Sequence, residues 1–170
     1  LFVYPIKGCH AVPVAEAVVE PWGLAHDRRL AVATTDGRIL TQREHPELAR
    51  VHCSLGGDGA LHVQVAGAGY DVPPSDGDVV PVRLWNDTVD AERLDGPLVA
   101  ALGVLVGQPV QLVRFPDHGH RACDRTYAPA GAVTAFADGF PLLVTNEATL
   151  VRLDEALLER GAEPVPMDRF

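Results

Sequence analysis

The first 90 residues alternate short apolar runs with turn-forming residues, a pattern typical of a β-rich fold. Gly, Pro and Asp mark the breaks between the runs, most clearly at 35–37 and 56–59, where a turn separates two strand-like runs. Short strands at regular spacing with turns between them predict an antiparallel barrel or sandwich. The predicted strands are residues 1–4, 12–20, 29–34, 38–42, 51–55, 60–65, 79–84 and 85–91.

The spacing of the apolar residues becomes helical after residue 96. Pro97 can occupy the first turn of a helix, and leucines recur at helical spacing up to Gly107. We expect a helix there, followed by a strand at 110–115. Residues 116–135 are polar and rich in Gly, Pro, His and Arg, which predicts a long irregular loop. The helical leucines are Leu98, Leu102 and Leu105.

A second strand and a second helix are predicted near the end of the chain. Residues 140–145 are apolar and follow an Asp-Gly turn, which favours a strand. Asn146 is a good N-cap, and leucines recur at helical spacing before Gly161. Residues 163–170 are interrupted by prolines and are interpreted as a loop. The leucines of this helix are Leu150, Leu153, Leu157 and Leu158.

Composition and charge exclude some classes of function. No apolar run reaches the roughly 18 residues of a membrane helix, and no signal peptide opens the chain. We therefore expect a soluble, cytoplasmic protein with no membrane partner. The net charge of −9 argues against a nucleic-acid partner, because phosphate neutralisation needs a basic surface. The excess negative charge lies entirely in 51–170, so residues 1–50 are the better place for a small anionic ligand.

Lys7 is the most informative single residue, because it is the only lysine beside thirteen arginines. A retained lysine suggests a site that requires a compact ammonium on a flexible stem. Gly8 follows it in a loop, and a glycine lets the backbone approach a ligand and expose an N–H group. Lys7 with free backbone N–H groups would form a phosphate cradle. An exposed surface lysine without a function explains these residues equally well.

Two charged segments, 26–29 (HDRR) and 41–44 (TQRE), adjoin the strands of the first predicted hairpin. Arginine suits phosphate because its planar guanidinium donates two parallel hydrogen bonds, and a neighbouring Asp can orient it. On these residues alone, an exposed ion-paired hairpin without a ligand is the favoured interpretation.

His118, His120 and Cys123 are the nearest approach to a metal-ligand pattern. Their spacing is not a strong zinc pattern and no fourth ligand is evident, so a disordered polar loop is favoured. The three cysteines, which also include Cys9 and Cys53, form no CxxC pair. We expect them to be reduced thiols with a structural or incidental role.

Five segments resemble, in the same order, the motifs of the MOSC family, and together they span almost the whole chain. Each motif alone is weak, but their joint specificity is high. They are similar to the family's YPVKSC, GL-x-x-DR, LTQR-x-x-P, F-x-DG-x-PLLLTN and V-x-x-x-RFRPN patterns. The segments are residues 4–9 (YPIKGC), 23–29 (GLAHDRR), 40–46 (LTQREHP), 136–146 (FADGFPLLVTN) and 165–170 (VPMDRF).

The resemblance, together with the strand pattern, implies an α+β, mostly β fold. Residues 1–115 would form the MOSC N-terminal domain, an antiparallel β-barrel-like unit with one helix. Residues 116–135 would be a loop. Residues 136–170 would be the beginning of a second β-barrel, the MOSC domain proper.

The resemblance also implies a molybdenum cofactor (molybdopterin). In this family the lysine of the first motif and the arginine of the second contact its phosphate and pterin, and here these are Lys7 and Arg28. The segment 138–140, with Asp138, Gly139 and Phe140, is expected to approach the cofactor. The remaining cofactor-binding residues expected from the motifs are Gly8, Arg29, Arg43, Asn146 and Arg169.

The activity implied is that of a molybdenum-cofactor-dependent oxidoreductase that reduces N-hydroxylated or related nitrogen compounds. Such an enzyme would take a small-molecule substrate and electrons from an iron–sulfur or haem partner. The alternative is a non-catalytic module that carries the cofactor or sulfur, similar to a sulfurtransferase. At the family level the resemblance also extends to pyridoxal phosphate binding.

Two departures from the family pattern affect the expected chemistry. Gly8 stands where the family often has Ser, so a hydroxyl is lost while the backbone N–H remains. The cysteine that ligates molybdenum in the family would lie beyond Phe170, and none of the three cysteines here matches it. We expect no metal ligand within residues 1–170, and therefore no complete catalytic molybdenum site.

Overall fold

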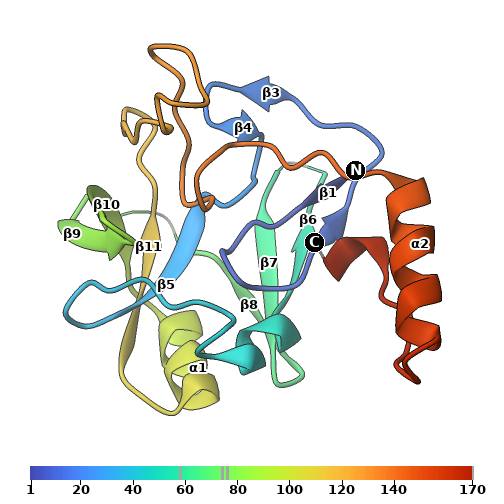
Figure 1. Cartoon of the computed structure of the whole chain (residues 1–170). Helices are drawn as coiled ribbons and strands as arrows, with labels where there is room; N and C mark the ends of the chain where they lie inside the picture. Colours follow the sequence, from blue (N-terminus) through green and yellow to red (C-terminus); the bar gives the residue numbers. More distant parts are fainter. Residues whose placement is uncertain (58, 74, 76, 170) are drawn as a thin grey trace.

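Figure 1 shows the computed structural model of the chain, which describes residues 1–57, 59–73, 75 and 77–169. Short strands dominate this part of the chain. They are β1 (Phe2–Val3), β2 (Val12–Pro13), β3 (Val19–Glu20), β4 (Gly23–Leu24), β5 (Leu30–Thr34), β6 (His52–Leu55), β7 (Leu61–Val65), β8 (Ala68–Asp71), β9 (Val79–Leu84), β10 (Asp87–Leu94) and β11 (Val110–Arg114). The helices are the 3₁₀-helices η1 (Pro46–Arg50) and η2 (Met167–Arg169) and the α-helices α1 (Pro97–Val106) and α2 (Glu147–Leu158).

The largest sheet is antiparallel, with the strand order β5-β11-β10-β9. Strand β5 joins the two hydrophobic clusters of the core, because successive side chains of a strand point to opposite faces. Leu30 and Val32 pack in one cluster, and Ala31 and Ala33 pack in the other. The apolar run that predicted this strand is therefore buried on both faces of the strand.

Helix α1 covers the first of these clusters. Its buried residues Leu98, Leu102 and Val106 follow one another at intervals of four, so they share one face of the helix. Gly107 ends the helix in the left-handed conformation, with a φ of +71°, as its position in the sequence indicated. In Figure 1 the helix lies beside the lower ends of β11 and β7.

A second antiparallel sheet, β6-β7-β8, packs beside the first cluster, and the pairs β1-β2 and β3-β4 complete the described strands. Most of the strand predictions are confirmed with small shifts at the ends, and β8 was not predicted. The predicted turn at 56–59 includes Asp58, which lies outside the described residues, but β6 and β7 on either side of it pair antiparallel. The confirmed strands are those predicted at 1–4, 29–34, 51–55, 60–65, 79–84, 85–91 and 110–115.

Three predicted strands are wrong in whole or in part. Residues 12–20 contribute only the two-residue strands β2 and β3 at their ends, and 38–42 form only isolated bridges. Residues 140–145 are not a strand, and Val144 is 91% exposed. Gly23 of β4 lies against Pro141, but the apolar run forms no ladder with β4 or with another described strand. An apolar pattern predicts a tendency to be buried but does not supply the neighbour that a strand needs.

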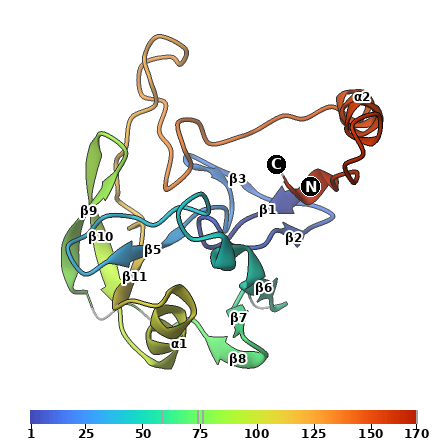
Figure 2. The same cartoon turned by 60° about the horizontal axis from the view of Figure 1, so that its bottom comes forward.

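Helix α2 lies at the edge of the molecule, away from the four-stranded sheet in both views (Figure 1 and Figure 2). It begins where predicted, because the Asn146 side chain accepts hydrogen bonds from the backbone N–H groups of Ala148 and Thr149. None of its residues is buried, so its leucine stripe has little packing. Local capping rather than tertiary contact accounts for where this helix starts.

The mostly β, α+β class is confirmed by these elements. The described strands lie in four separate sheets, so the barrel remains a prediction. The domain limits at 115 and 135 also remain predictions. Of the helices in the described residues, neither α1 nor α2 combines the length and the apolar character needed to cross a membrane.

We expect Leu102→Ala to reduce the free energy of unfolding by about 2–5 kcal/mol, because Leu102 is fully buried and its truncation leaves a cavity. Val104→Ala is a matched control on the same helix, since Val104 is 84% exposed, and it should change stability by less than about 0.5 kcal/mol. Urea unfolding followed by circular dichroism measures both. Equal losses in the two variants would contradict the burial of Leu102.

Candidate functional site

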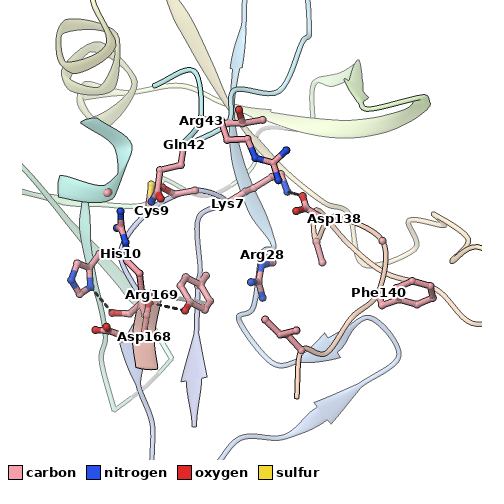
Figure 3. Close-up of a pocket in the computed structure, with 18 of the residues that line it drawn as sticks. Lys7, Cys9, His10, Arg28, Gln42, Arg43, Asp138, Phe140, Asp168 and Arg169 are labelled. Carbon is pink, nitrogen blue, oxygen red and sulfur yellow. Dashed lines mark hydrogen bonds and ion pairs between the residues drawn. The ribbon is translucent and has the colours of Figure 1, made fainter. Parts of the chain in front are cut away.

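A cavity of about 760 Å³ opens between the loop that follows β1, the turn before β5, the 41–43 loop and the segment 137–143. Figure 3 shows Lys7, Arg43 and Asp138 meeting on one side of it, with Arg169 and Asp168 near His10 on the other. The charged and ring-bearing side chains of the lining are those of Tyr4, Lys7, His10, Arg28, Arg43, Trp85, Asp138, Phe140, Asp168 and Arg169.

The backbone around Lys7 is held firmly against the core. Its N–H donates to the carbonyl of Leu30 at 2.8 Å, at the start of β5. Gly8 follows with a φ of +77°, a conformation that side chains disfavour, and its carbonyl accepts a hydrogen bond from Gln42 Nε2 at 3.0 Å. This geometry explains a glycine in the loop and presents Lys7 to the cavity in a fixed position.

Lys7 and Asp138 form the central ion pair of the site. Lys7 Nζ lies 2.7 Å from Asp138 Oδ1, although the two residues are 131 positions apart in the chain. Burial lowers the pKa of Lys7, and the hydrogen bond to Asp138 partly offsets this effect. Burial acts to raise the pKa of Asp138, but the hydrogen bonds from Lys7 and Trp85 and the charges of Lys7 and Arg43 together outweigh it, so this pKa lies below its usual value. The Asp138 carboxyl is therefore ionised at neutral pH.

Arg28 has a separate set of partners. Its backbone adopts a φ of +49°, and its N–H donates to the carbonyl of Tyr4 at 2.7 Å. Its guanidinium Nη1 lies 2.6 Å from Asp27 Oδ2 and stacks over the Tyr4 ring, 4.6 Å from the centroid. The buried Asp27 also accepts the Tyr4 backbone N–H at 2.7 Å, so it orients both residues. Lys7 and Arg28 line one cavity although they are 21 positions apart in the sequence.

Arg43 and Arg169 complete the set of cations. The Arg43 guanidinium stacks 5.8 Å from the Trp85 ring centroid. Within the part of the chain that the structure describes, neither arginine forms an ion pair. Arg169 belongs to η2, whose neighbour Asp168 accepts a hydrogen bond from the Tyr4 hydroxyl through its backbone carbonyl at 2.9 Å. Four cationic and two acidic side chains thus line a cavity in a protein with a net charge of −9.

Arg121 supports the site from behind, and the sequence did not indicate it. The side chain is buried, and its Nε donates to Asp87 Oδ2 at 2.7 Å. Its Nη1 donates to the carbonyls of Ala135 and Ala137 at 3.1 and 2.6 Å, and its Nη2 to that of Asp138 at 2.8 Å. The expectation of a disordered loop at 116–135 is therefore wrong for this part of it. A basic residue in a polar loop gives no signal that distinguishes a buried clamp from a solvated side chain.

Two of the expected cofactor-binding residues lie elsewhere. Arg29 stacks on Trp22, 4.5 Å from the ring centroid, and donates to the carbonyl of Phe115 and to Asp117. Asn146 caps α2. The structure brings eight of the ten to the cavity lining, namely Lys7, Gly8, Arg28, Arg43, Asp138, Gly139, Phe140 and Arg169.

The cysteines have the environment of unreactive thiols. All three are free, and burial raises the pKa of Cys9 well above its usual value and that of Cys53 to about 12. Burial also raises the pKa of Cys123. Among the described residues, no group of three or more His, Cys, Asp and Glu side chains is placed to hold a metal ion.

Residues 1–96 match the family described as the MOSC N-terminal beta barrel domain. The chain is 28% identical over 171 residues to mitochondrial amidoxime-reducing component 1 of Homo sapiens, a match that covers 92% of this chain and 50% of that protein. It is 44% identical over 173 residues to mitochondrial amidoxime reducing component 2 of Macaca fascicularis, covering 91% and 49%. It is 29% identical over 155 residues to the molybdenum cofactor sulfurase of Caenorhabditis briggsae, covering 90% and 20%. The chain spans about half the length of the amidoxime-reducing relatives.

Arg121→Met should reduce the free energy of unfolding by about 2–4 kcal/mol, because it leaves the buried carbonyls of residues 135 and 137 without their donor. Asp87 is half exposed, so water compensates for most of its lost contact. The matched control is Arg125→Met in the same loop, where the side chain is exposed and a change below about 0.5 kcal/mol is expected. Urea unfolding followed by tryptophan fluorescence measures both. An equal loss of stability in Arg125→Met would show that the loop requires positive charge and not the hydrogen bonds of Arg121.

Cys9 and Cys53 should resist alkylation by iodoacetamide while the protein is folded. At about pH 8, a thiol with a pKa of about 12 is ionised in only about one molecule in ten thousand, and only the thiolate reacts. Mass spectrometry of timed samples should show labelling of both residues at least about a hundredfold slower than in urea-unfolded protein. Rapid labelling of Cys9 in the folded state would contradict its burial.

Proposed function

Because the chain belongs to the family of MOSC N-terminal beta barrel domains, we propose that its cavity binds the molybdenum cofactor through the phosphate and pterin of that cofactor. The observation that carries the proposal is the cationic lining, in which Lys7, Arg28, Arg43 and Arg169 share one cavity. Ammonium and guanidinium groups make the strongest hydrogen bonds to phosphate oxygens. The relatives named amidoxime-reducing component and molybdenum cofactor sulfurase support the same assignment.

The size and lining of the cavity fit a phosphorylated pterin. Its volume of about 760 Å³ falls within the range of roughly 300–1,000 Å³ that small-molecule sites occupy. We assign Lys7 and Arg28 to the phosphate, and the rings of Trp85 and Phe140 to the flat pterin. Gly8 lines the cavity, and its positive φ disfavours a residue with a side chain at this position.

In this proposal the residues of the chain bind and orient the cofactor. When bound, the cofactor supplies redox chemistry at molybdenum, which the side chains described here cannot provide. The reaction of the whole protein is then the reduction of N-hydroxylated or related nitrogen compounds, with electrons from an iron–sulfur or haem partner. The names of the two amidoxime-reducing relatives support this reaction class.

Sulfur delivery is a second candidate, and the similarity to molybdenum cofactor sulfurases favours it. In that case the same cavity would hold the cofactor while it receives sulfur, and the protein would carry the cofactor without reducing an amidoxime. Molybdenum analysis and amidoxime turnover of the full-length protein separate the two candidates. Bound molybdenum with turnover supports the reductase, and bound molybdenum without turnover supports the carrier.

We expect Lys7→Gln and Arg28→Gln each to weaken cofactor binding by about 10- to 100-fold, since each removes one charge-assisted contact to phosphate. The chain is mixed with molybdenum cofactor released from a donor protein, and the retained pterin is measured by fluorescence after oxidation. Arg152→Gln is a matched control, because Arg152 is exposed on α2 and does not line the cavity.

The control should bind as tightly as the unaltered chain. Equal retention of pterin by all four proteins, with their folding unchanged, would overturn the proposed site.

A further inference from the structure

The Lys7–Asp138 pair is unequal in its exposure to solvent. The Lys7 side chain is 9% exposed, whereas that of Asp138 is 67% exposed. The buried cation is therefore the fixed member of the pair, and the carboxylate is the member that water already reaches. Figure 3 shows the two side chains side by side. An exposed partner gives up little when it is released to solvent, because water replaces most of its hydrogen bonds.

The backbone of Asp138 is held by Arg121, whereas its carboxylate is held only by the side chains of Lys7 and Trp85. Arg121 Nη2 donates to the Asp138 carbonyl at 2.8 Å, and Arg121 also holds the carbonyl of Ala137. The carboxylate can consequently leave Lys7 by rotation about the side-chain bonds without a shift of the loop. The displaced group would stay at the wall of the cavity, since Asp138 is one of its lining residues.

The positions of the charges make this displacement a condition of anion binding at Lys7. The Lys7 ammonium is neutralised at 2.7 Å by Asp138, just as Arg28 is neutralised at 2.6 Å by Asp27. Asp27 is 6% exposed and accepts a backbone N–H as well, so it is a permanent partner. The Asp138 carboxylate is held by side chains alone among the described residues: Lys7 and Trp85 donate hydrogen bonds to it, and the charge of Arg43 lies nearby.

We propose that Asp138 is an internal counterion that occupies the anion position at Lys7, competes with the anionic ligand and thereby sets the affinity of the site. The proposal rests on the proposed function, because it requires that Lys7 binds an anion. The ligand concerned is a phosphate group, which must displace a carboxylate before it reaches the buried ammonium. Asp138 then determines the specificity of the site. An anion that binds Lys7 no more tightly than the Asp138 carboxylate does cannot displace it.

The test is a titration of the chain with inorganic phosphate at about pH 8 and constant ionic strength, followed by amide chemical shifts. Asp138→Asn keeps the shape of the side chain and removes its charge, and we expect it to tighten phosphate binding by about tenfold. Asp138→Glu keeps the charge and should remain near the wild type. Asp138→Ala is a second variant without a carboxylate, in case the Asn variant folds poorly by thermal denaturation.

Two controls separate competition from a general gain of positive charge. Asp168→Asn removes the other lining carboxylate and changes the net charge equally, and it should change the dissociation constant by less than about threefold, because Asp168 forms no described ion pair with Lys7. In the Lys7→Gln background, Asp138→Asn should not change phosphate affinity further, since the cation for which phosphate and carboxylate compete is absent.

The outcomes divide clearly between the two proposals. If the wild type binds phosphate and Asp138→Asn binds it no more tightly, the competition is refuted while the anion site stands. An equal gain from Asp168→Asn, or the same gain in the Lys7→Gln background, also refutes it. If neither the wild type nor Asp138→Asn binds phosphate, the anion site and the competition fall together.

Discussion

The cavity depends on the buried guanidinium of Arg121, whose hydrogen bonds must be satisfied inside the protein because water does not reach it. Its partners come from two places, the carboxylate of Asp87 at the start of β10 and the carbonyls of Ala135, Ala137 and Asp138. Satisfying these donors ties the long loop, the main sheet and the wall of the cavity into one arrangement. Arg121 holds the backbone of Asp138 so that the Asp138 side chain lies next to Lys7. The central ion pair therefore also depends on Arg121.

The lining of the cavity has more cationic than acidic side chains, although the protein as a whole is acidic. Three of the four lining cations have a different local partner, namely the exposed carboxylate of Asp138 for Lys7, the buried Asp27 for Arg28 and the Trp85 ring for Arg43. Because these partners are close and few, they do not cancel the positive charge of the lining as a whole. A cavity lined in this way attracts anionic ligands, which is what the proposed cofactor binding requires.

Signals that act over a few residues predicted their elements well. Gly107 ended α1 and Asn146 began α2, because capping depends on the backbone groups of a single turn. The apolar run at 140–145 misled, since a strand needs a partner that its own residues do not specify. Family motifs singled out Lys7 and Arg28 but also included Arg29, which packs against aromatic rings outside the cavity. Adjacent arginines look alike in a motif, although their side chains point to different places.

By itself, the sequence determined the mostly β class and the two helices, and it singled out Lys7 as the only lysine. These follow from periodicity, capping residues and composition, which are properties of neighbouring positions. Tertiary structure alone decided that Lys7 meets Asp138 across 131 positions and that Arg121 is buried behind them. A charged side chain is tolerated inside a protein only where distant parts of the chain supply its counter-charge and acceptors, and that supply is settled when the chain folds.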